Sequence, residues 1–216
     1  ETPEGTEIGL RKNLALLAKI STRSDLEDVE LIKILTSLGM QREMESEGSD
    51  IFFNGRFIGH IKETKEFISS LKKRKRAGEL PIELSVRYHK VLDNVLLSTE
   101  VGRVMRPLIV IEEGKSKLTE EHMKLLRENS LTWDDLLKSG VIEYLDAAEE
   151  ENSLVALTGE EITEEHTHLE IDKIDFLGVV TSLVPYANYD QSSRLNRGSK
   201  TQKQGLGLYA ANFLCR

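Results

Sequence analysis

A two-residue turn signal near position 54 constrains the fold of this chain more than any other feature. Asn54 and Gly55 stand between the apolar runs 51–53 and 56–61. The tightest hairpin turns need a positive φ at both central residues, and Asn followed by Gly tolerates that conformation best. The sequence therefore predicts a β-hairpin over 51–61, and with it an antiparallel sheet.

Two helical patterns flank this hairpin. Apolar residues recur at helical spacing from Leu31 until Gly39, behind a capping box expected at Ser24 and Glu27. A second helix is expected over 65–77, with Phe67, Ile68 and Leu71 directed inward and Gly78 as its stop. Alternating residues predict further strands over 85–91, 94–98, 104–112, 141–145 and 166–171.

The stretch 119–146 reads as two short helices followed by a strand. Thr119 is expected to cap 120–128 and Thr132 to cap 133–139, with Gly140 as the stop. Pro107 cannot donate to a neighbouring strand, so we expect it at a sheet edge. Residues 150–165 read as an acidic loop, and the apolar run 176–185 is expected to be buried. The fold class is α+β, with several small mixed modules in series.

Length and composition exclude several classes of protein. No apolar run among the 216 residues approaches the roughly 18 needed to cross a membrane, so no membrane partner is expected. The single cysteine, Cys215, excludes a disulfide framework and a cysteine zinc site, and we expect a cytoplasmic location. The start at Glu1 and the stop after the apolar run 206–214 suggest a piece of a longer polypeptide.

Charge is unevenly distributed along the chain, whose formal net charge is −8. Residues 112–172 hold 18 acidic and 5 basic residues, whereas residues 191–216 hold 5 basic residues and no acidic ones. A reversal of this kind indicates that one segment faces a polyanion.

The basic segment has a helical arrangement suited to phosphate. On a helix beginning near Ser193, Arg197, Lys200 and Gln204 share a face, and Lys203 flanks it. Arginine binds phosphate through a fork of donors, and this composition is typical of binding a nucleic-acid backbone without reading its sequence. The alternative is a solvated helix with ordinary surface cations.

Three other clusters favour structural interpretations. The cations at 72–76 end a helix, where they complement the helix dipole in solvent. His166 and His168 are expected at the edge of a strand, because a metal site needs a third ligand. The glutamates at 149–151, near Asp146, are expected in a solvated acidic loop. We expect no metal site and no self-contained catalytic residues.

Four runs in order resemble the second-largest subunit of cellular RNA polymerases, closest to the archaeal form. They lie at 1–14, at 102–108, at 140–147 with the acidic residues after it, and at 167–212. The resemblance implies that 1–20 ends the fork region, 21–103 forms the first external domain, 104–147 the second, and 148–216 the start of a β-rich, incomplete hybrid-binding domain.

The resemblance also implies site residues. Arg194 matches an arginine that reaches the phosphates of the incoming nucleotide. Gln204 matches a glutamine on the RNA backbone, with Lys203 and Asn196 as weaker members of that motif. Thr2, Pro3, Glu4 and Gly5 would lie at the fork near downstream DNA.

The same resemblance implies a chain that is inactive alone and works inside DNA-directed RNA polymerase, a nucleotidyltransferase. Its partners would be the largest and the other polymerase subunits, the DNA template, the RNA transcript and nucleoside triphosphates. This chain would bind no cofactor. Mg²⁺ would be held mainly by the largest subunit, and the zinc site of the full subunit would lie outside this chain. The alternative is a non-enzymatic assembly or adaptor module with an acidic surface that docks other proteins.

Overall fold

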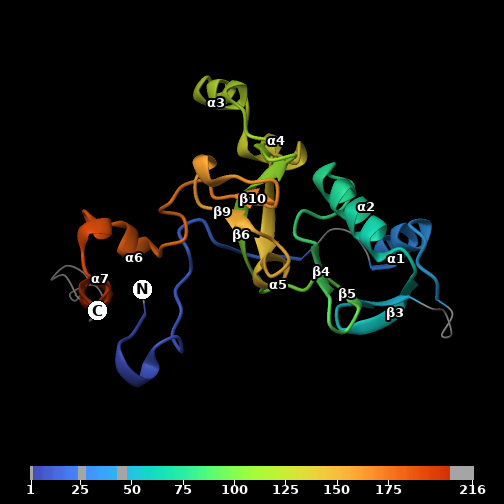
Figure 1. The fold of residues 1–216 in the computed structure, drawn as a ribbon, viewed down its shortest axis with the longest axis horizontal. Helices are drawn as coiled ribbons and strands as arrows, with labels where there is room; N and C mark the ends of the chain where they lie inside the picture. The colour runs from blue at the N-terminus through green and yellow to red at the C-terminus, as the bar shows by residue number, and fades with distance from the viewer. Residues whose placement is uncertain (1, 24–27, 43–47, 205–216) are drawn as a thin grey trace, which may run out of the picture. The chain divides into compact units, whose positions relative to one another are not determined.

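The computed structural model describes residues 2–23, 28–42 and 48–204 of the chain (Figure 1). The chain divides into two compact units, one made of Glu1–Leu17 with Lys173–Arg216, the other of Ala18–Asp172. The expected capping residues Ser24 and Glu27 lie outside the described residues.

A four-stranded sheet forms around the predicted hairpin. Its strands are β2 (Ser49–Phe53), β3 (Arg56–Ile61), β4 (Ser85–His89) and β5 (Asn94–Ser98), in the order β3-β2-β5-β4. The hairpin is confirmed, because β2 and β3 pair antiparallel and Asn54 and Gly55 have φ values of 47° and 75°. Strands β2 and β5 are parallel neighbours, which places the later strand pair beside the hairpin.

Two helices complete the core of this sheet. Helix α1 spans Asp28–Ser37 and helix α2 spans Thr64–Arg76. Leu35 of α1 and Leu71 of α2 are fully buried in one cluster with Ile51 and Val95 of the sheet. The predicted inward face of the second helix is therefore confirmed, and Gly78, with a φ of 76°, follows its end.

A second sheet is built on the long strand β6 (Val104–Glu112). Its other strands are β1 (Lys19–Ile20), β7 (Lys115–Ser116), β8 (Ile142–Asp146), β9 (Val155–Ala156) and β10 (His168–Leu169), and β1, β7, β8 and β10 all pair with β6. The expectation that Pro107 marks an edge strand is wrong, since β6 is central. Pro107 is tolerated because β1 pairs at 104–105 and β10 at 109–110, leaving its flank open between them.

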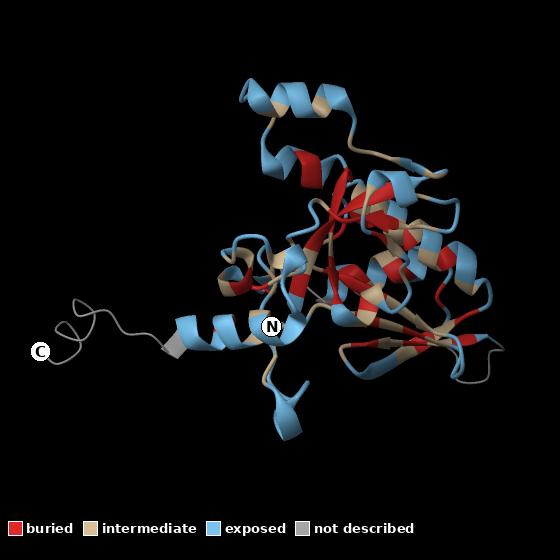
Figure 2. Cartoon of the chain, turned by 60° about the vertical axis from the view of Figure 1, so that its left-hand side comes forward, coloured by how far each residue is buried: buried red, intermediate tan, exposed pale blue. Residues whose placement is uncertain are grey.

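Capping residues define the two short helices as predicted. Helix α3 spans Glu120–Arg127 and helix α4 spans Trp133–Lys138. Thr119 and Thr132 form capping boxes with His122 and Asp135, which satisfy backbone N–H groups of the first turns. Figure 2 shows α3 almost wholly exposed, and none of its residues is buried.

The acidic stretch after β8 is more ordered than predicted. A short helix, α5 (Ala147–Glu150), follows β8, and a 3₁₀ turn, η2, spans Gly159–Glu161. Strands β9 and β10 are each two residues long and pair parallel.

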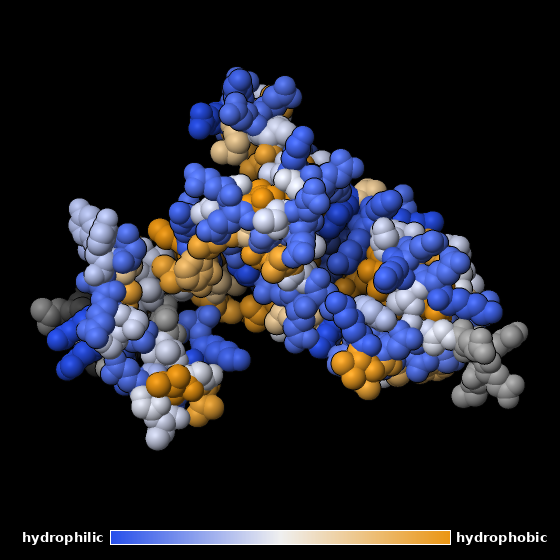
Figure 3. All heavy atoms as spheres, in the orientation of Figure 1, coloured by the Kyte–Doolittle hydropathy of each residue, from blue (hydrophilic) through white to orange (hydrophobic). Residues whose placement is uncertain are grey.

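The unit made of 1–17 and 173–216 is largely helical where described. It contains η1 (Gly5–Glu7), α6 (Val179–Ser182), η3 (Ala187–Tyr189) and α7 (Ser192–Gln204). The two segments of the unit meet where Leu16 N donates to Leu177 O over 2.8 Å. Figure 3 shows apolar side chains gathered around η1, where Ile8 and Leu10 are exposed.

The prediction that 176–185 is buried is wrong for its largest side chains. Phe176, Val179 and Leu183 are 54%, 57% and 72% exposed. An apolar run predicts burial only where the described chain supplies a surface to cover it, and these three side chains lie on the uncovered side of the segment.

The α+β class is confirmed by two mixed sheets with helices. The boundaries at 20, 103 and 147 stay predictions. Residues 148–172 belong to the same compact unit as β6.

No helix among the described residues is long and apolar enough to cross a membrane.

Candidate functional site

Helix α7 carries the predicted phosphate-binding side chains. Arg194, Arg197 and Lys200 are all exposed, as a helix beginning near Ser193 predicts. No described carboxylate forms an ion pair with any of the three, so their charges face solvent.

A buried hydroxyl pair anchors this helix. Ser199 is 1% exposed, and its Oγ lies 2.8 Å from Oγ1 of Thr181 in the short helix α6. At 100° per residue, Ser199 lies on a different face from Arg194, Arg197 and Lys200. One face of α7 is therefore attached to its unit while the cationic face is free.

The structure brings two predicted site residues together. The backbone N–H of Thr2 donates to Oδ1 of Asn196 over 3.4 Å, and Oγ1 of Thr2 accepts from Gly9 N over 3.1 Å. Asn196 is half-buried, and its Oδ1 holds the amino-terminal segment through this bond. Pro3 and Glu4 lead into η1, where Gly5 has a φ of 81°.

Two predicted residues cannot be placed by their side chains. The backbones of Lys203 and Gln204 continue α7, but their side chains lie outside the described residues. Their assignment to the RNA backbone stays a prediction.

A buried charge cluster lies in the other unit, and the sequence reading missed it. We define it as Lys75, Arg76, Glu143, Glu149 and His168. The Nζ of Lys75 lies 3.1 Å from Oε2 of Glu149 and 3.2 Å from Oε1 of Glu143, and it donates to the carbonyl of Tyr144 over 3.3 Å. The cluster joins α2 to β8 and α5.

Arg76 and His168 complete the cluster around Glu143. Nε of Arg76 donates to Oε2 of Glu143 over 3.0 Å, and Nε2 of His168 lies 3.5 Å from the same oxygen. Lys75, Glu143, Glu149 and His168 are all at most 4% exposed. Buried charges persist when they are paired in this way.

Burial and pairing shift the pKa values of the cluster in opposite directions. Burial, aided by the nearby Glu143, raises the pKa of Glu149 to about 7, although Lys75 opposes the shift. Burial alone would also raise the pKa of Glu143, but Lys75, His168 and Arg76 together hold it well below its usual range. Burial lowers the pKa of His168.

Three predictions are therefore wrong. Lys75 is not a solvated cation near a helix end, because it lies on the buried stripe of Phe67 and Leu71, at a spacing of four residues. Glu149 and Asp146 do not belong to a solvated loop, since both are buried. His168 is not an edge histidine, because it is 1% exposed.

Two further arginines of this unit also pair with acidic side chains. Arg103 donates to Asp146 over 2.7 Å and to the carbonyl of Glu83 over 2.6 Å. Arg106 pairs with Glu150 and Glu170. The runs 102–108 and 140–147 are thus neighbours, since β6 and β8 pair over Met105–Ile109.

This geometry presents cations on the surface of one unit and pairs buried charges inside the other. Among the described residues, no three His, Cys, Asp or Glu side chains are arranged to hold a metal ion. The expectation that Mg²⁺ and zinc are held elsewhere stays a prediction. The fold and its charges thus define an α+β chain with two small sheets in one unit and an exposed cationic helix in the other.

Comparison with known proteins identifies the family. The description "RNA polymerase Rpb2, domain 4" matches residues 51–112, and "RNA polymerase Rpb2, domain 5" matches residues 133–178. Together these matches take in half of the chain. The chain therefore belongs to the Rpb2 family, the second-largest subunits of DNA-directed RNA polymerases.

Archaeal and eukaryotic relatives align with the whole chain. It is 40% identical over 232 residues to DNA-directed RNA polymerase subunit Rpo2 of Saccharolobus shibatae, covering 100% of this chain and 20% of that protein. It is 38% identical over 231 residues to subunit Rpo2 of Sulfolobus acidocaldarius, with the same coverage of both proteins. It is 35% identical over 224 residues to DNA-directed RNA polymerase III subunit RPC2 of Schizosaccharomyces pombe, covering 100% of this chain and 19% of that protein. The chain thus spans about a fifth of the length of these relatives.

Proposed function

We propose that this chain acts in template-directed RNA synthesis as part of an archaeal-type second-largest polymerase subunit, in the cytoplasm. The archaeal relatives have 38–40% identity to it, and a eukaryotic one 35%. The chain works only in the assembled enzyme, with the largest and other subunits, DNA, RNA and nucleoside triphosphates as partners. Mg²⁺ is held mainly by the largest subunit, and the zinc site lies outside this chain.

One observation carries the proposal for the site. Helix α7 presents Arg194, Arg197 and Lys200 to solvent with no described carboxylate to neutralise them, while Ser199 holds its other face. Phosphoryl transfer is catalysed largely by positioning and by neutralising charge on the phosphates. A helix fixed on one side and cationic on the other suits that task.

The individual roles follow the motif. Arg194 contacts the phosphates of the incoming nucleotide, and Gln204, Lys203 and Asn196 contact the RNA backbone of the hybrid. Residues 2–5 lie at the fork near downstream DNA. The contact between Thr2 and Asn196 supports a shared location for the fork segment and the hybrid-binding segment.

The test is Arg194→Ala in the assembled polymerase. A charge-assisted hydrogen bond contributes about 1.5–3 kcal/mol, so we expect the KM for nucleoside triphosphates to rise about tenfold or more. Elongation at varied nucleotide concentration measures this. Arg127→Ala is the matched control, because it removes an exposed helical arginine from α3 in the other unit. An unchanged KM and elongation rate in Arg194→Ala would refute the phosphate role.

The composition suggests an adaptor module with an acidic docking surface, but the structure supports this alternative less well. Glu143, Asp146, Glu149, Glu150 and Glu170 pair with cations of the same unit. These five carboxylates are therefore used inside the fold and are not free to dock another protein.

A further inference from the structure

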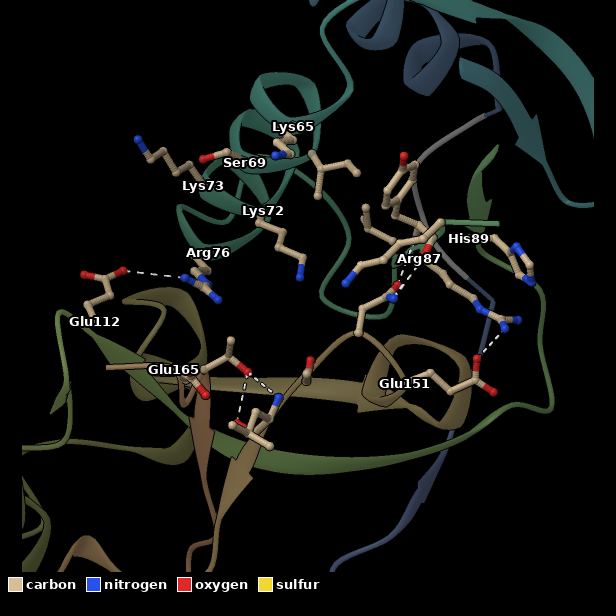
Figure 4. Close-up of a pocket in the computed structure, with 18 of the residues that line it drawn as sticks. Lys65, Ser69, Lys72, Lys73, Arg76, Arg87, His89, Glu112, Glu151 and Glu165 are labelled. Atoms are coloured by element: carbon tan, nitrogen blue, oxygen red, sulfur yellow. Dashed lines mark hydrogen bonds and ion pairs between the residues drawn. The ribbon is translucent and has the colours of Figure 1, made fainter. Parts of the chain in front are cut away.

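A groove in the unit Ala18–Asp172 gathers cations that the proposed function does not use. It has a volume of about 870 Å³ and lies between α2, the end of β4 and the segment that follows α5 (Figure 4). Six cations line it: Lys65, Lys72, Lys73, Arg76, Arg87 and Lys90. Three glutamates line it as well: Glu112, Glu151 and Glu165. Cations thus outnumber acids there, although the whole unit has 21 basic and 32 acidic residues.

The arginines and the lysines of the groove differ in their pairing. Arg76 pairs with Glu112 over 3.6 Å, and Arg87 pairs with Glu151. None of the four lysines forms an ion pair with another described residue. Figure 4 shows Lys72 extending from α2 into the space above the strands. The uncompensated positive charge of the groove therefore belongs to lysines, which are flexible point charges.

Apolar side chains lie between these charges. Ile68, Val86, Val91 and Leu154 line the same groove, and Val91 is 89% exposed. In edge strand β4, the backbone groups of Tyr88 already have hydrogen-bond partners. Its N–H donates to Oδ1 of Asn152 over 2.8 Å, and its carbonyl accepts from Nδ2 of Asn152 over 3.0 Å. A ligand here is recognised through side chains and not by adding a strand to β4.

We propose that this groove binds an acidic peptide segment of a partner protein, with apolar side chains between its carboxylates. Carboxylates complement the free lysines, and the apolar side chains cover Ile68, Val91 and Leu154. This inference stands apart from the polymerase roles of α7, since it uses other residues in the other unit.

Nucleic acid fits the same groove less well. Both arginines, the side chains that hold phosphate bidentately, already pair with glutamates. The hydroxyl of Tyr88, the aromatic residue in the groove, donates to Asp93 over 2.7 Å. A phosphate backbone running beyond the groove would also meet the acidic surface of the unit, which a short peptide avoids.

The test uses a short fluorescein-labelled peptide of glutamates with leucine at every third position. Fluorescence anisotropy at low salt follows its binding to the full 216-residue chain. We expect Lys65→Gln/Lys72→Gln/Lys90→Gln to weaken binding about tenfold, because it removes three free charges from the groove. The control Lys33→Gln/Lys124→Gln/Lys138→Gln removes the same charge from exposed positions outside it, and we expect less than about a twofold effect.

A single variant and two further ligands complete the test. Lys90 is exposed in the turn after β4, so Lys90→Gln leaves the core intact and should weaken binding about twofold even if the triple variant unfolds. Equal effects of the two triple variants would overturn the proposal. So would undiminished binding of a peptide with glutamine in place of glutamate, or tighter binding of single-stranded oligodeoxythymidine than of the acidic peptide.

Discussion

At the scale of single residues, the most informative side chain is Lys75. It sits where a helical period places an apolar residue, and it neutralises two buried carboxylates at once. Its pKa is raised even though burial alone would lower it, because Glu149 and Glu143 both stabilise the ammonium form. The local sequence shows a lysine among cations, whereas the fold makes it part of the core.

Replacing Lys75 should destabilise the unit strongly. In Lys75→Met, Glu143 keeps Arg76 but Glu149 loses its cation, and breaking a buried pair costs about 3–5 kcal/mol. Urea denaturation measures the free energy of unfolding. Lys73→Met, on the exposed face of the same helix, should change it by less than about 0.5 kcal/mol. If Lys75→Met/Glu149→Gln were no more stable than Lys75→Met, the unpaired carboxylate would not be the cause.

The raised pKa of Glu149 predicts that the free energy of unfolding depends on pH. Its pKa is raised from 4.5 to about 7 in the folded chain, so over that interval the unfolded chain ionises while the folded one keeps its proton. The free energy of unfolding from this group therefore falls as the pH rises from about 4.5 to about 7. Glu149→Gln removes this titration.

The measurement is the difference in unfolding free energy between Glu149→Gln and the unmodified chain at several pH values. We expect the difference to move in favour of the variant by on the order of 1–3 kcal/mol between about pH 5 and about pH 8. The lowered pKa of His168 acts in the opposite sense, because the stability that this group contributes is lost as the pH falls below 6.5, the ordinary pKa of histidine. That contribution is present in both proteins. Parallel curves would show that Glu149 does not titrate in this interval.

At the scale of elements, the join between α2, α4 and β8 depends on one glycine. Gly140 follows α4 with a φ of 65°, and a Cβ there would lie 2.8 Å from both Cβ and O of Arg76. The position therefore needs a left-handed conformation and also close approach to α2. The stop expected from the sequence explains the first requirement, and the second arises only from packing.

Gly140→Ala should cost more than the backbone conformation alone. A left-handed alanine costs about 1–2 kcal/mol, and displacing the backbone of α2 should bring the total to about 2–4 kcal/mol. Gly78→Ala is the matched control, since Gly78 has a φ of 76° but nothing within 4 Å of its would-be Cβ. Thermal and urea unfolding of the two variants compare them. Equal losses would mean that contact with Arg76 adds nothing.

At the scale of the whole molecule, the described core is concentrated in one unit. All the fully buried hydrophobic side chains among the described residues lie between Leu31 and Leu169. The other unit has Leu10, Leu183 and Tyr186 at least 72% exposed. Stability of the described chain should therefore reside in Ala18–Asp172.

A chain of residues 18–172 alone should fold. We expect a far-UV circular dichroism spectrum of mixed α and β type and a single cooperative thermal transition, because small domains with their own core unfold in that way. Residues 1–17 and 173–216 joined by a glycine-rich linker serve as the comparison and should show no such transition. Noncooperative melting of 18–172 would mean that its core depends on the remaining residues.

Local signals determined much of the fold by sequence alone. The Asn54-Gly55 hairpin, the caps at Thr119 and Thr132, and the strands 94–98 and 104–112 appear as predicted, because turn dihedrals and capping hydrogen bonds involve residues close in sequence. The basic helix at 193–204 was predictable for the same reason. The family was readable from four runs of residues, and the sequence comparisons support it.

Only the tertiary structure decided which charges are buried. Glu143 interrupts an apolar strand, and Lys75 interrupts an apolar helix face. Each stands at a position that predicts burial, but the sequence does not show which residue it pairs with. Their contact joins positions 68 residues apart, so its energy depends on how α2 meets β8 and not on local propensity. The exposure of 176–185 has the same origin, because burial is a property of the surfaces that meet and not of the residues alone.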